Sequence, residues 1–289
     1  VKAAQTAIAN IAKKLKLSIE AMAEGIIQLA VIQMTSSVKE ISVMRGIDPR
    51  DFTLVAFGGA GPMHGALIAE ELGMARVVIP PLPGNFSAFG LLVADTRHDV
   101  AKTEIMQLEF SDISDIRRAL IPLENEARER LRADGFANDQ IRIEASLDMR
   151  YVGQSFELNI MLPAELTDTE ELMEAFHKAY EQRYSHRDQG SGEVIAFRVT
   201  GFGNMDRPPL PSVLGGNELA ASIRDTRQVI FNSVSRETTV YWREDLPLNT
   251  TFGGPAIIEE RGSTTVVPPN FNVLMDPTGS LVLDRKTTK

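Results

Sequence analysis

The sequence predicts a mixed α/β protein whose C-terminal part is rich in β-strands. Residues 53–73 pass from an apolar stretch through a glycine turn into an amphipathic segment, which is a strand–turn–helix pattern. Residues 141–162 alternate apolar and polar side chains on both sides of Gly153, as a β-hairpin does. From Thr226 onward, short strand-like segments alternate with Gly- and Pro-containing turns, which favours a small β-barrel or sandwich.

The first hundred residues predict an α/β layer. Apolar residues recur at helical spacing over 2–16, and again from Ser18, a suitable N-cap, to about residue 44. Gly46 and the following Asp-Pro step end this second helix. The rest of the layer is predicted to contain a helix that ends at Gly73, a strand over 76–79, a proline-rich loop over 80–84 and a short, buried helix over 88–94.

The middle of the chain predicts an α+β unit. Amphipathic helices are expected over 112–134 and 169–184, and strands over 141–150, 155–162 and 194–203. Phe176, Tyr180 and Tyr184 fall on one face of the second helix, which predicts that they face a core. Residues 208–216 are rich in Pro and Gly and predict a linker or long loop. The expected domains are residues 1–100, 101–205 and 206–289.

The composition argues against several classes of function. The 289 residues carry a net charge of −9 and no basic block, so a nucleic-acid partner is not expected. The apolar run over 26–32 is interrupted by Gln28 and is too short for a membrane span. The absence of cysteine excludes disulfides, thiol nucleophiles and thiolate metal sites, and favours a cytoplasmic location. The chain starts at Val1 inside a helical pattern, which predicts a fragment of a longer protein.

The glycine turn has two interpretations from the residues alone. Gly58, Gly59 and Gly61 let a backbone approach a ligand closely, and the following helix N-terminus favours negative charge, as in a nucleotide site. A dinucleotide fingerprint would also need an acidic residue about twenty positions on, where Ile79 stands, and Pro62 removes a backbone donor. A tight turn needed only for packing is the other interpretation.

Two further polar groupings are candidate sites. His64 lies in the first helical turn after the glycines, either as a surface histidine or as part of a site. No two of the four histidines have metal-ligand spacing, so no metal site is expected in this chain. Asp148, Arg150 and Gln154 surround Gly153 and form either a surface turn with a local ion pair or a polar cluster that lines a cleft or interface.

Seven blocks in order along the chain resemble the C-terminal half of the hydantoinase A/oxoprolinase family, of the ATP-dependent N-methylhydantoinase type. The blocks are Arg45–Phe52, Phe57–His64, Pro80–Gly84, Ser87–Gly90 with Ala94-Asp95, Asp148–Gln154, Gly254–Glu259 and Ser263–Pro269. The resemblance is weakest over 101–140 and 205–235.

This resemblance implies a fold of the actin, sugar-kinase and heat-shock-ATPase kind, in which two ribonuclease-H-like lobes close on ATP and Mg²⁺. The chain would hold part of the second lobe, followed by the α+β unit and the β-rich end. The implied nucleotide-binding residues, on the adenosine side, are Gly58, Gly59, Ala60 and Gly61. Possible cleft or substrate residues are His64, Gly84, Ser87, Asp148, Arg150 and Gln154. The catalytic residues are expected upstream of Val1.

The implied activity is ATP-dependent opening of a cyclic amide such as a hydantoin, oxoproline or lactam, with the fragment inactive by itself. Relatives in the same family carboxylate ketones, and the residues do not separate the two reactions. A third interpretation is a region for subunit interaction without a ligand of its own. The implied partners are a hydantoinase B-type subunit, the missing N-terminal lobe and a small cyclic amide, in an oligomer when the protein is full length.

Overall fold

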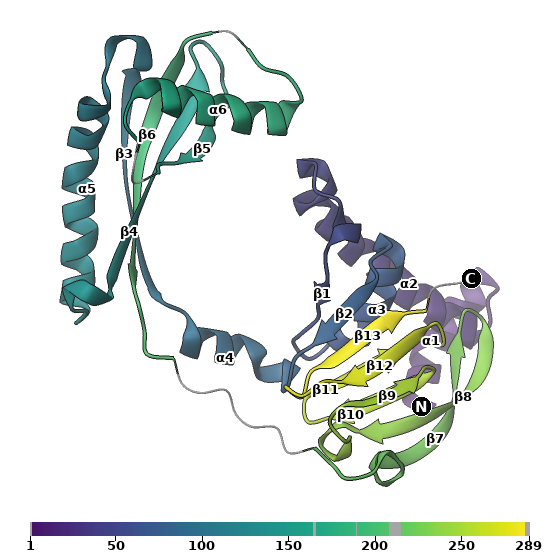
Figure 1. Ribbon diagram of the computed structural model, residues 1–289. Helices are drawn as coiled ribbons and strands as arrows, with labels where there is room; N and C mark the ends of the chain where they lie inside the picture. Colours follow the sequence, from purple (N-terminus) through teal and green to yellow (C-terminus); the bar gives the residue numbers. More distant parts are fainter. Residues whose placement is uncertain (1, 164–165, 189, 208–214, 287–289) are drawn as a thin grey trace. The chain divides into compact units, whose positions relative to one another are not determined.

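The computed structural model describes residues 2–163, 166–188, 190–207 and 215–286 (Figure 1). The chain divides into two compact units, one formed by residues 1–91 together with 209–289, the other by residues 92–208. This grouping differs from the three consecutive domains expected from the sequence, because strands from both ends of the chain share one sheet. The predicted linker over 208–216 lies mostly outside the described residues.

Two helices open the first unit, as predicted. They are α1 (Lys2–Leu15) and α2 (Ile19–Ile41). The hydroxyl of Ser18 accepts the backbone N–H of Ala21 at 3.1 Å, which satisfies one of the free donors at the start of α2. After α2 the chain makes a short 3₁₀ turn that ends at Gly46, whose φ of +76° favours glycine.

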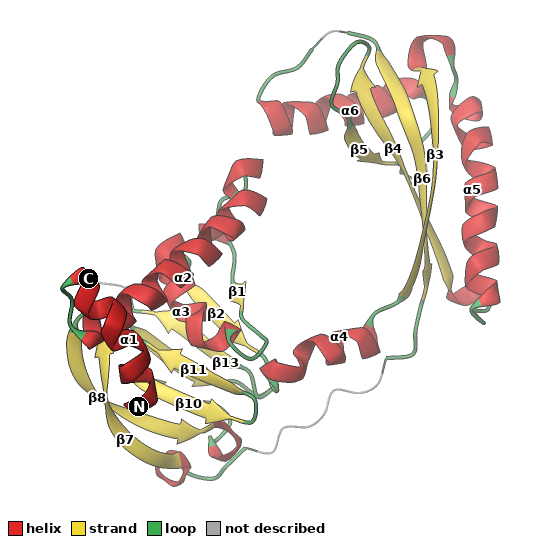
Figure 2. Cartoon of the chain, turned by 180° about the vertical axis from the view of Figure 1, so that it is seen from behind, coloured by secondary structure: helices red, strands yellow, loops and turns green. Residues whose placement is uncertain are grey.

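Two open sheets form the β part of the first unit (Figures 1 and 2). The five-stranded sheet has the order β1 (Leu54–Val55), β2 (Arg76–Ile79), β13 (Leu281–Arg285), β12 (Phe271–Met275) and β9 (Thr250–Gly253). The four-stranded sheet has the order β11 (Ser263–Val267), β10 (Ala256–Glu260), β8 (Val234–Trp242) and β7 (Ile223–Phe231). Both sheets keep free edges among the described strands, so of the predicted C-terminal barrel or sandwich the closed barrel is not formed.

The core of this unit combines residues that are distant in the sequence. Helix α3 (Gly61–Leu72) contributes the buried Ala66 and Ala69. Strand β13 runs antiparallel to β2 with Leu283 opposite Val77, and both side chains are fully buried. Residues 1–91 therefore bury their apolar surface against the C-terminal strands, and the α/β layer and the β-rich end form one folding unit.

A buried arginine joins the same two segments. Arg243 follows β8, and its guanidinium donates to the carbonyl oxygens of Ile79, Pro80 and Gly279 at 2.8–2.9 Å. A further nitrogen lies 2.7 Å from Oε1 of Glu260, and only 5% and 4% of these two side chains are exposed. Burial lowers the pKa of Arg243 and raises that of Glu260, and their mutual attraction opposes both shifts. The pair cross-links the end of β2 to β10 and to the β12–β13 turn.

The second unit is a four-stranded antiparallel sheet with helices on one face. The sheet has the order β3 (Thr96–Gln107), β6 (Gly192–Gly203), β4 (Ile141–Tyr151) and β5 (Leu158–Met161). Helices α5 (Ile113–Ala133) and α6 (Thr169–Tyr184) pack on the face that carries Leu147 and Met149. The predicted hairpin of β4 and β5 is confirmed by their register. Strand β3 was not predicted.

The aromatic stripe on α6 agrees with the sequence for two of its three residues. Phe176 and Tyr180 are buried in the core against Tyr151, whereas Tyr184, at the end of the helix, is exposed. The short helix predicted before β3 is present, but its predicted burial is wrong. Helix α4 (Phe86–Val93) has no buried residue, and Leu91 is 81% exposed.

The N-terminal helices also expose apolar side chains. Leu29, Ile32 and Ile41 of α2 are more than half exposed, as is Leu15 of α1. By length and composition alone, the segment Ile19–Arg45 is long and apolar enough to cross a membrane, in contrast to the expectation from the interrupted run at 26–32. This is weak evidence for a span, because helices of water-soluble proteins meet the same criterion.

Candidate functional site

The glycine turn connects β1 to α3, as predicted. Gly58 has φ +84°, a backbone conformation that side chains rarely adopt, and its N–H donates to the carbonyl of Pro83 at 2.7 Å. Ala60 is the N-cap residue of α3 without a side-chain capping bond, and Pro62 lies in the first helical turn. The exposed residues Gly59 and Ala60 present bare backbone next to a helix N-terminus.

Two other loops pack against this turn. A Cβ atom added to Gly59 would lie 3.4 Å from the carbonyl oxygen of Gly262, and one added to Gly84 would lie 3.3 Å from the same oxygen. The hydroxyl of Ser263 donates to the carbonyl of Gly59 at 3.3 Å. Three loops therefore meet here: the glycine turn, the proline-rich loop that contains Pro83 and Gly84, and the turn between β10 and β11.

The other glycines of this region also have packing roles. Behind Gly61 lies the backbone of Ala56, 3.6 Å from the position of an added Cβ. A Cβ on Gly65 would come within 2.8 Å of the Ala56 side chain and 3.3 Å of Val77, so this glycine lets α3 approach its strands closely. Packing thus requires a glycine at Gly65, whereas a Cβ added to Gly59 or Gly61 would make ordinary van der Waals contacts. The outer face of the exposed turn is open to a ligand, and nucleotide binding there stays a prediction.

His64 and Ser87 both belong to the first unit. His64 is half-buried in the first turn of α3, and its Nδ1 is buried without a hydrogen-bond partner in the described part of the chain. Ser87 is exposed near the start of α4, next to the aromatic pair Phe57 and Phe86, whose ring centres are 5.3 Å apart. Phe57 directly precedes the glycine turn and is 45% exposed. The ring of Phe57, in contact with that of Phe86, is therefore partly exposed beside the turn.

Asp148 lies in the second unit, on the sheet face opposite the helices. Its side chain is 8% exposed and accepts hydrogen bonds from Nε of Arg198 at 2.6 Å and from the amide of Asn159 at 2.8 Å. Asp148 is one of the residues around a hollow of about 580 Å³. The polar side chains around it are Arg97, Asp99, Glu144, Ser146, Asp148, Asn159, Arg198 and Thr200. This arrangement suits recognition of a polar ligand or partner surface.

Arg150 and Gln154 do not join Asp148 in this hollow. Arg150 donates to the buried carboxylate of Glu193 on β6 at 2.8 Å, so its ion pair crosses strands and is not local to the turn. Gln154 donates to the hydroxyl of Tyr180 on α6 at 3.2 Å. The cluster predicted around Gly153 is therefore divided among different contacts.

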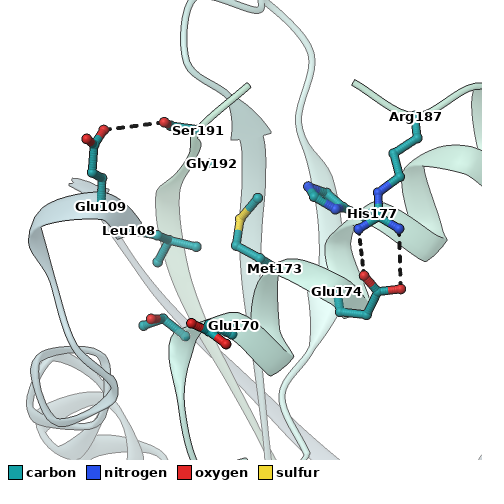
Figure 3. A pocket seen from close by; sticks show the side chains of 10 residues that line it. Leu108, Glu109, Glu170, Met173, Glu174, His177, Arg187, Ser191 and Gly192 are labelled. Carbon is teal, nitrogen blue, oxygen red and sulfur yellow. Dashed lines mark hydrogen bonds and ion pairs between the residues drawn. The ribbon is translucent and has the colours of Figure 1, made fainter. Parts of the chain in front are cut away.

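Sequence reasoning missed a second hollow in this unit, shown in Figure 3. It encloses about 310 Å³ between the start of α6 and the segment around Ser191. Both ring nitrogens of His177 are buried without a hydrogen-bond partner in the described residues, and burial lowers its pKa, with Arg187 adding to the effect. Glu174 forms a two-fold ion pair with Arg187 beside it. Nothing in the spacing of His177 marks it out from the sequence.

No group of three or more His, Asp or Glu side chains that could hold a metal ion occurs among the residues described by the structure. The predicted site residues fall in both units: Gly58, Gly59, Ala60, Gly61, His64, Gly84 and Ser87 in the first, and Asp148, Arg150 and Gln154 in the second.

Comparisons with known proteins match nearly the full length of the chain. Residues 1–100 match the model of the hydantoinase/oxoprolinase family, and residues 106–284 match that of the hydantoinase/oxoprolinase C-terminal domain. The chain is 34% identical to the alpha subunit of caprolactamase from Pseudomonas jessenii over 95% of its length, which covers 41% of that protein. It is 29% identical to the acetone carboxylase beta subunit of Xanthobacter autotrophicus, over 93% of this chain and 40% of the relative.

A solved structure agrees with this similarity. The crystal structure of the ATP-dependent caprolactamase from Pseudomonas jessenii superposes with a TM-score of 0.87 and 33% identity, over 99% of this chain and 43% of that one. The chain therefore spans about two fifths of the length of these relatives.

Proposed function

Since the chain belongs to the hydantoinase/oxoprolinase family, we propose that it is part of the ATP-binding subunit of an ATP-dependent cyclic-amide hydrolase. The observation that carries the proposal is the similarity to the ATP-dependent caprolactamase, which extends over 99% of the chain. The substrate class is a hydantoin, oxoproline or lactam. Because the chain covers about two fifths of that protein, the complete activity is proposed for the full-length enzyme only.

The glycine turn is the proposed nucleotide contact, on the adenosine side of a cleft of the actin and sugar-kinase kind. Its residues fit this role, since Gly59 and Ala60 are exposed, the Cβ position of Gly58 faces open space and Phe57 offers an exposed ring. Pro62 and the Gly58 N–H bound to Pro83 argue against a phosphate-cradling loop. Close approach of an adenosine needs bare backbone more than donors.

The proposed chemistry overcomes the poor electrophilicity of an amide. Transfer of the terminal phosphoryl group of ATP to the carbonyl oxygen of the ring would leave the carbonyl carbon open to attack by water. The ring nitrogen would then take up a proton and leave as the C–N bond breaks, which opens the ring and gives an acyl phosphate. A second water would hydrolyse the acyl phosphate to the carboxylate and inorganic phosphate. Such transfer depends on positioning and on charge stabilisation. The described residues contain no group of three or more His, Asp or Glu side chains that could hold a metal ion, and we assign no Mg²⁺ ligand to this chain. Catalytic groups are expected in the part of the enzyme that precedes residue 1.

The proposed partners are the first lobe of the same polypeptide and a hydantoinase B-type subunit, in a cytoplasmic oligomer. The similarity to proteins named as alpha and beta subunits supports a multi-subunit enzyme. The polar hollow around Asp148 and Arg198 is our candidate for a substrate cleft or for the contact with the B-type partner.

The test is phosphate release by the full-length protein with its B-type partner. We expect release that depends on a hydantoin, oxoproline or lactam, with one ring opened for each ATP hydrolysed. Release that depends on acetone and bicarbonate would instead favour a ketone carboxylase, a second candidate supported by the acetone carboxylase relative. No stimulation by either class would contradict both, and would leave a subunit-interaction role.

A further inference from the structure

We propose that Gly262, in the turn between β10 and β11, and Ser263, the first residue of β11, are positioning residues for the nucleotide site. The inference rests on the nucleotide role proposed above for the glycine turn. It adds that this turn is held in its ligand-binding shape by a segment 204 residues further along the chain.

The contacts that support the proposal converge on one residue of the glycine turn. Ser263 donates its hydroxyl to the carbonyl of Gly59 at 3.3 Å. The carbonyl of Gly262 occupies the space beside Gly59, 3.4 Å from where a Cβ would stand. Gly59 is thus fixed on its inner side by two neighbouring residues, one in the β10–β11 turn and one at the start of β11. Its exposed outer side is the one available to a ligand.

The proline-rich loop completes the support of the glycine turn. Gly84 approaches the same Gly262 carbonyl, with 3.3 Å to an added Cβ, and Pro83 accepts the N–H of Gly58 at 2.7 Å. The β10–β11 turn therefore acts on the glycine turn both directly and through this loop.

A common anchor fixes both supporting segments. The buried guanidinium of Arg243 binds the carbonyl of Pro80, where the proline-rich loop begins, and the carboxylate of Glu260, where the β10–β11 turn begins. The proline-rich loop and the β10–β11 turn thus both begin at this buried ion pair, and both contact the glycine turn. Together they form a rigid support for it. A nucleotide that contacts the turn would bind to a backbone that is already ordered, which lowers the entropic cost of binding.

The first test changes only the backbone preference at residue 262. Gly262 has φ +81° and open space around its Cβ position, so Gly262→Ala strains the turn without a steric clash. Gly46→Ala is a matched control in the same unit, since Gly46 has φ +76° and open space but belongs to the turn after α2. In the full-length enzyme with its partner, we expect Gly262→Ala to raise KM for ATP at least about three-fold above Gly46→Ala.

The second test removes the hydroxyl contact. Ser263→Ala deletes one neutral hydrogen bond, for which we expect a rise in KM and Kd for ATP of about 2- to 10-fold. Ser263→Thr keeps the hydroxyl and should retain most of the affinity. The control Ser222→Ala removes another buried serine hydroxyl of the same unit, which donates to the carbonyl of Leu219 and not to the glycine turn.

A positioning role predicts a selective effect. KM and Kd for ATP should rise in Gly262→Ala and Ser263→Ala, while KM for the cyclic amide stays within about two-fold of the control variants and melting temperatures match theirs. Equal ATP affinity in test and control variants would overturn the inference and leave the proposed function intact. Absence of ATP binding by the unmodified full-length enzyme, measured by calorimetry, would overturn both.

Discussion

Replacing Arg243 with methionine should destabilise the first unit severely. The substitution keeps an apolar stem of similar length but removes the guanidinium that binds three backbone carbonyls and the carboxylate of Glu260. The carboxylate would remain almost fully buried without its cation. Removal of one partner of a buried ion pair costs about 3–5 kcal/mol.

The loss of stability expected for Arg243→Met can be compared with that for an exposed ion pair that also involves strand β10. Arg227 of β7 pairs with Glu259, the residue next to Glu260, and about two fifths of each side chain is exposed to water. Because exposed pairs contribute about 0–1 kcal/mol, Arg227→Met should have a small effect. The structure therefore predicts a difference of about 2–5 kcal/mol between two Arg→Met substitutions whose partners are adjacent residues.

Urea denaturation of the 289-residue chain, followed by tryptophan fluorescence, measures this difference. The single tryptophan, Trp242, is next to Arg243 and in the same unit. The double variant Arg243→Met/Glu260→Gln should regain part of the loss, because no buried charge is then left unpaired. Equal midpoints for Arg243→Met and Arg227→Met would refute the assignment of Arg243 as the buried cross-link.

Three further predictions concern glycines and a histidine. Gly65→Ala should destabilise the chain by about 1–3 kcal/mol, because the added methyl group would clash with Ala56, the residue that follows β1. Gly25→Ala, in α2 with open space around it, should be neutral or stabilise the chain by up to about 1 kcal/mol. Thermal melts that rank the two variants in the opposite order would contradict the packing. The pKa of His177 is lowered, so its unfolded state binds more protons below about pH 6.5 and stability should fall as the pH drops through that value. His177→Phe should lose part of this acid sensitivity in urea melts at about pH 7 and about pH 5.5. Gly59→Val should abolish ATP binding by the full-length enzyme, and unchanged affinity in calorimetry would reject the nucleotide role of the turn.

The interpretation of the Gly59 variant changes with the structure. From the sequence, a valine at this position is expected to fill space needed by the adenosine. In the structure, the Cβ position of Gly59 instead faces the carbonyl of Gly262. A loss of ATP binding would therefore arise through displacement of the β10–β11 turn as well as through the ligand, and the Gly262 and Ser263 variants separate these causes.

Local signals in the sequence were sufficient for most helices and for the hairpin. Ser18 caps α2, Gly46 and Gly73 adopt the left-handed conformation after their helices, and the alternation around Gly153 gives β4 and β5. Each of these depends on residues within a few positions of one another, where backbone preferences and side-chain periodicity act directly.

Features that depend on distant residues could not be predicted in this way. Strand β3 carries charged residues on its exposed positions, and its partner β6 lies about 100 residues further along the chain. The apolar composition of α4 indicated burial, but composition does not say what covers a helix, and Leu91 and Leu92 are largely exposed. Likewise, no pattern near Gly59 indicates that Gly262 lies beside it.

The contacts of the glycine turn connect the two family matches physically. The turn belongs to the segment matched over residues 1–100, and the β10–β11 turn to the C-terminal match over 106–284, yet both lie in one compact unit. Strand β2 has β13 as its antiparallel neighbour, and Arg243 binds the carbonyls at the end of β2. Cutting the chain between the two matched regions would therefore remove one side of the sheet, half of the core and the inner support of the glycine turn together. The C-terminal strands therefore support the proposed nucleotide site. In the sequence, the second unit, residues 92–208, is inserted between the two segments that form the first unit.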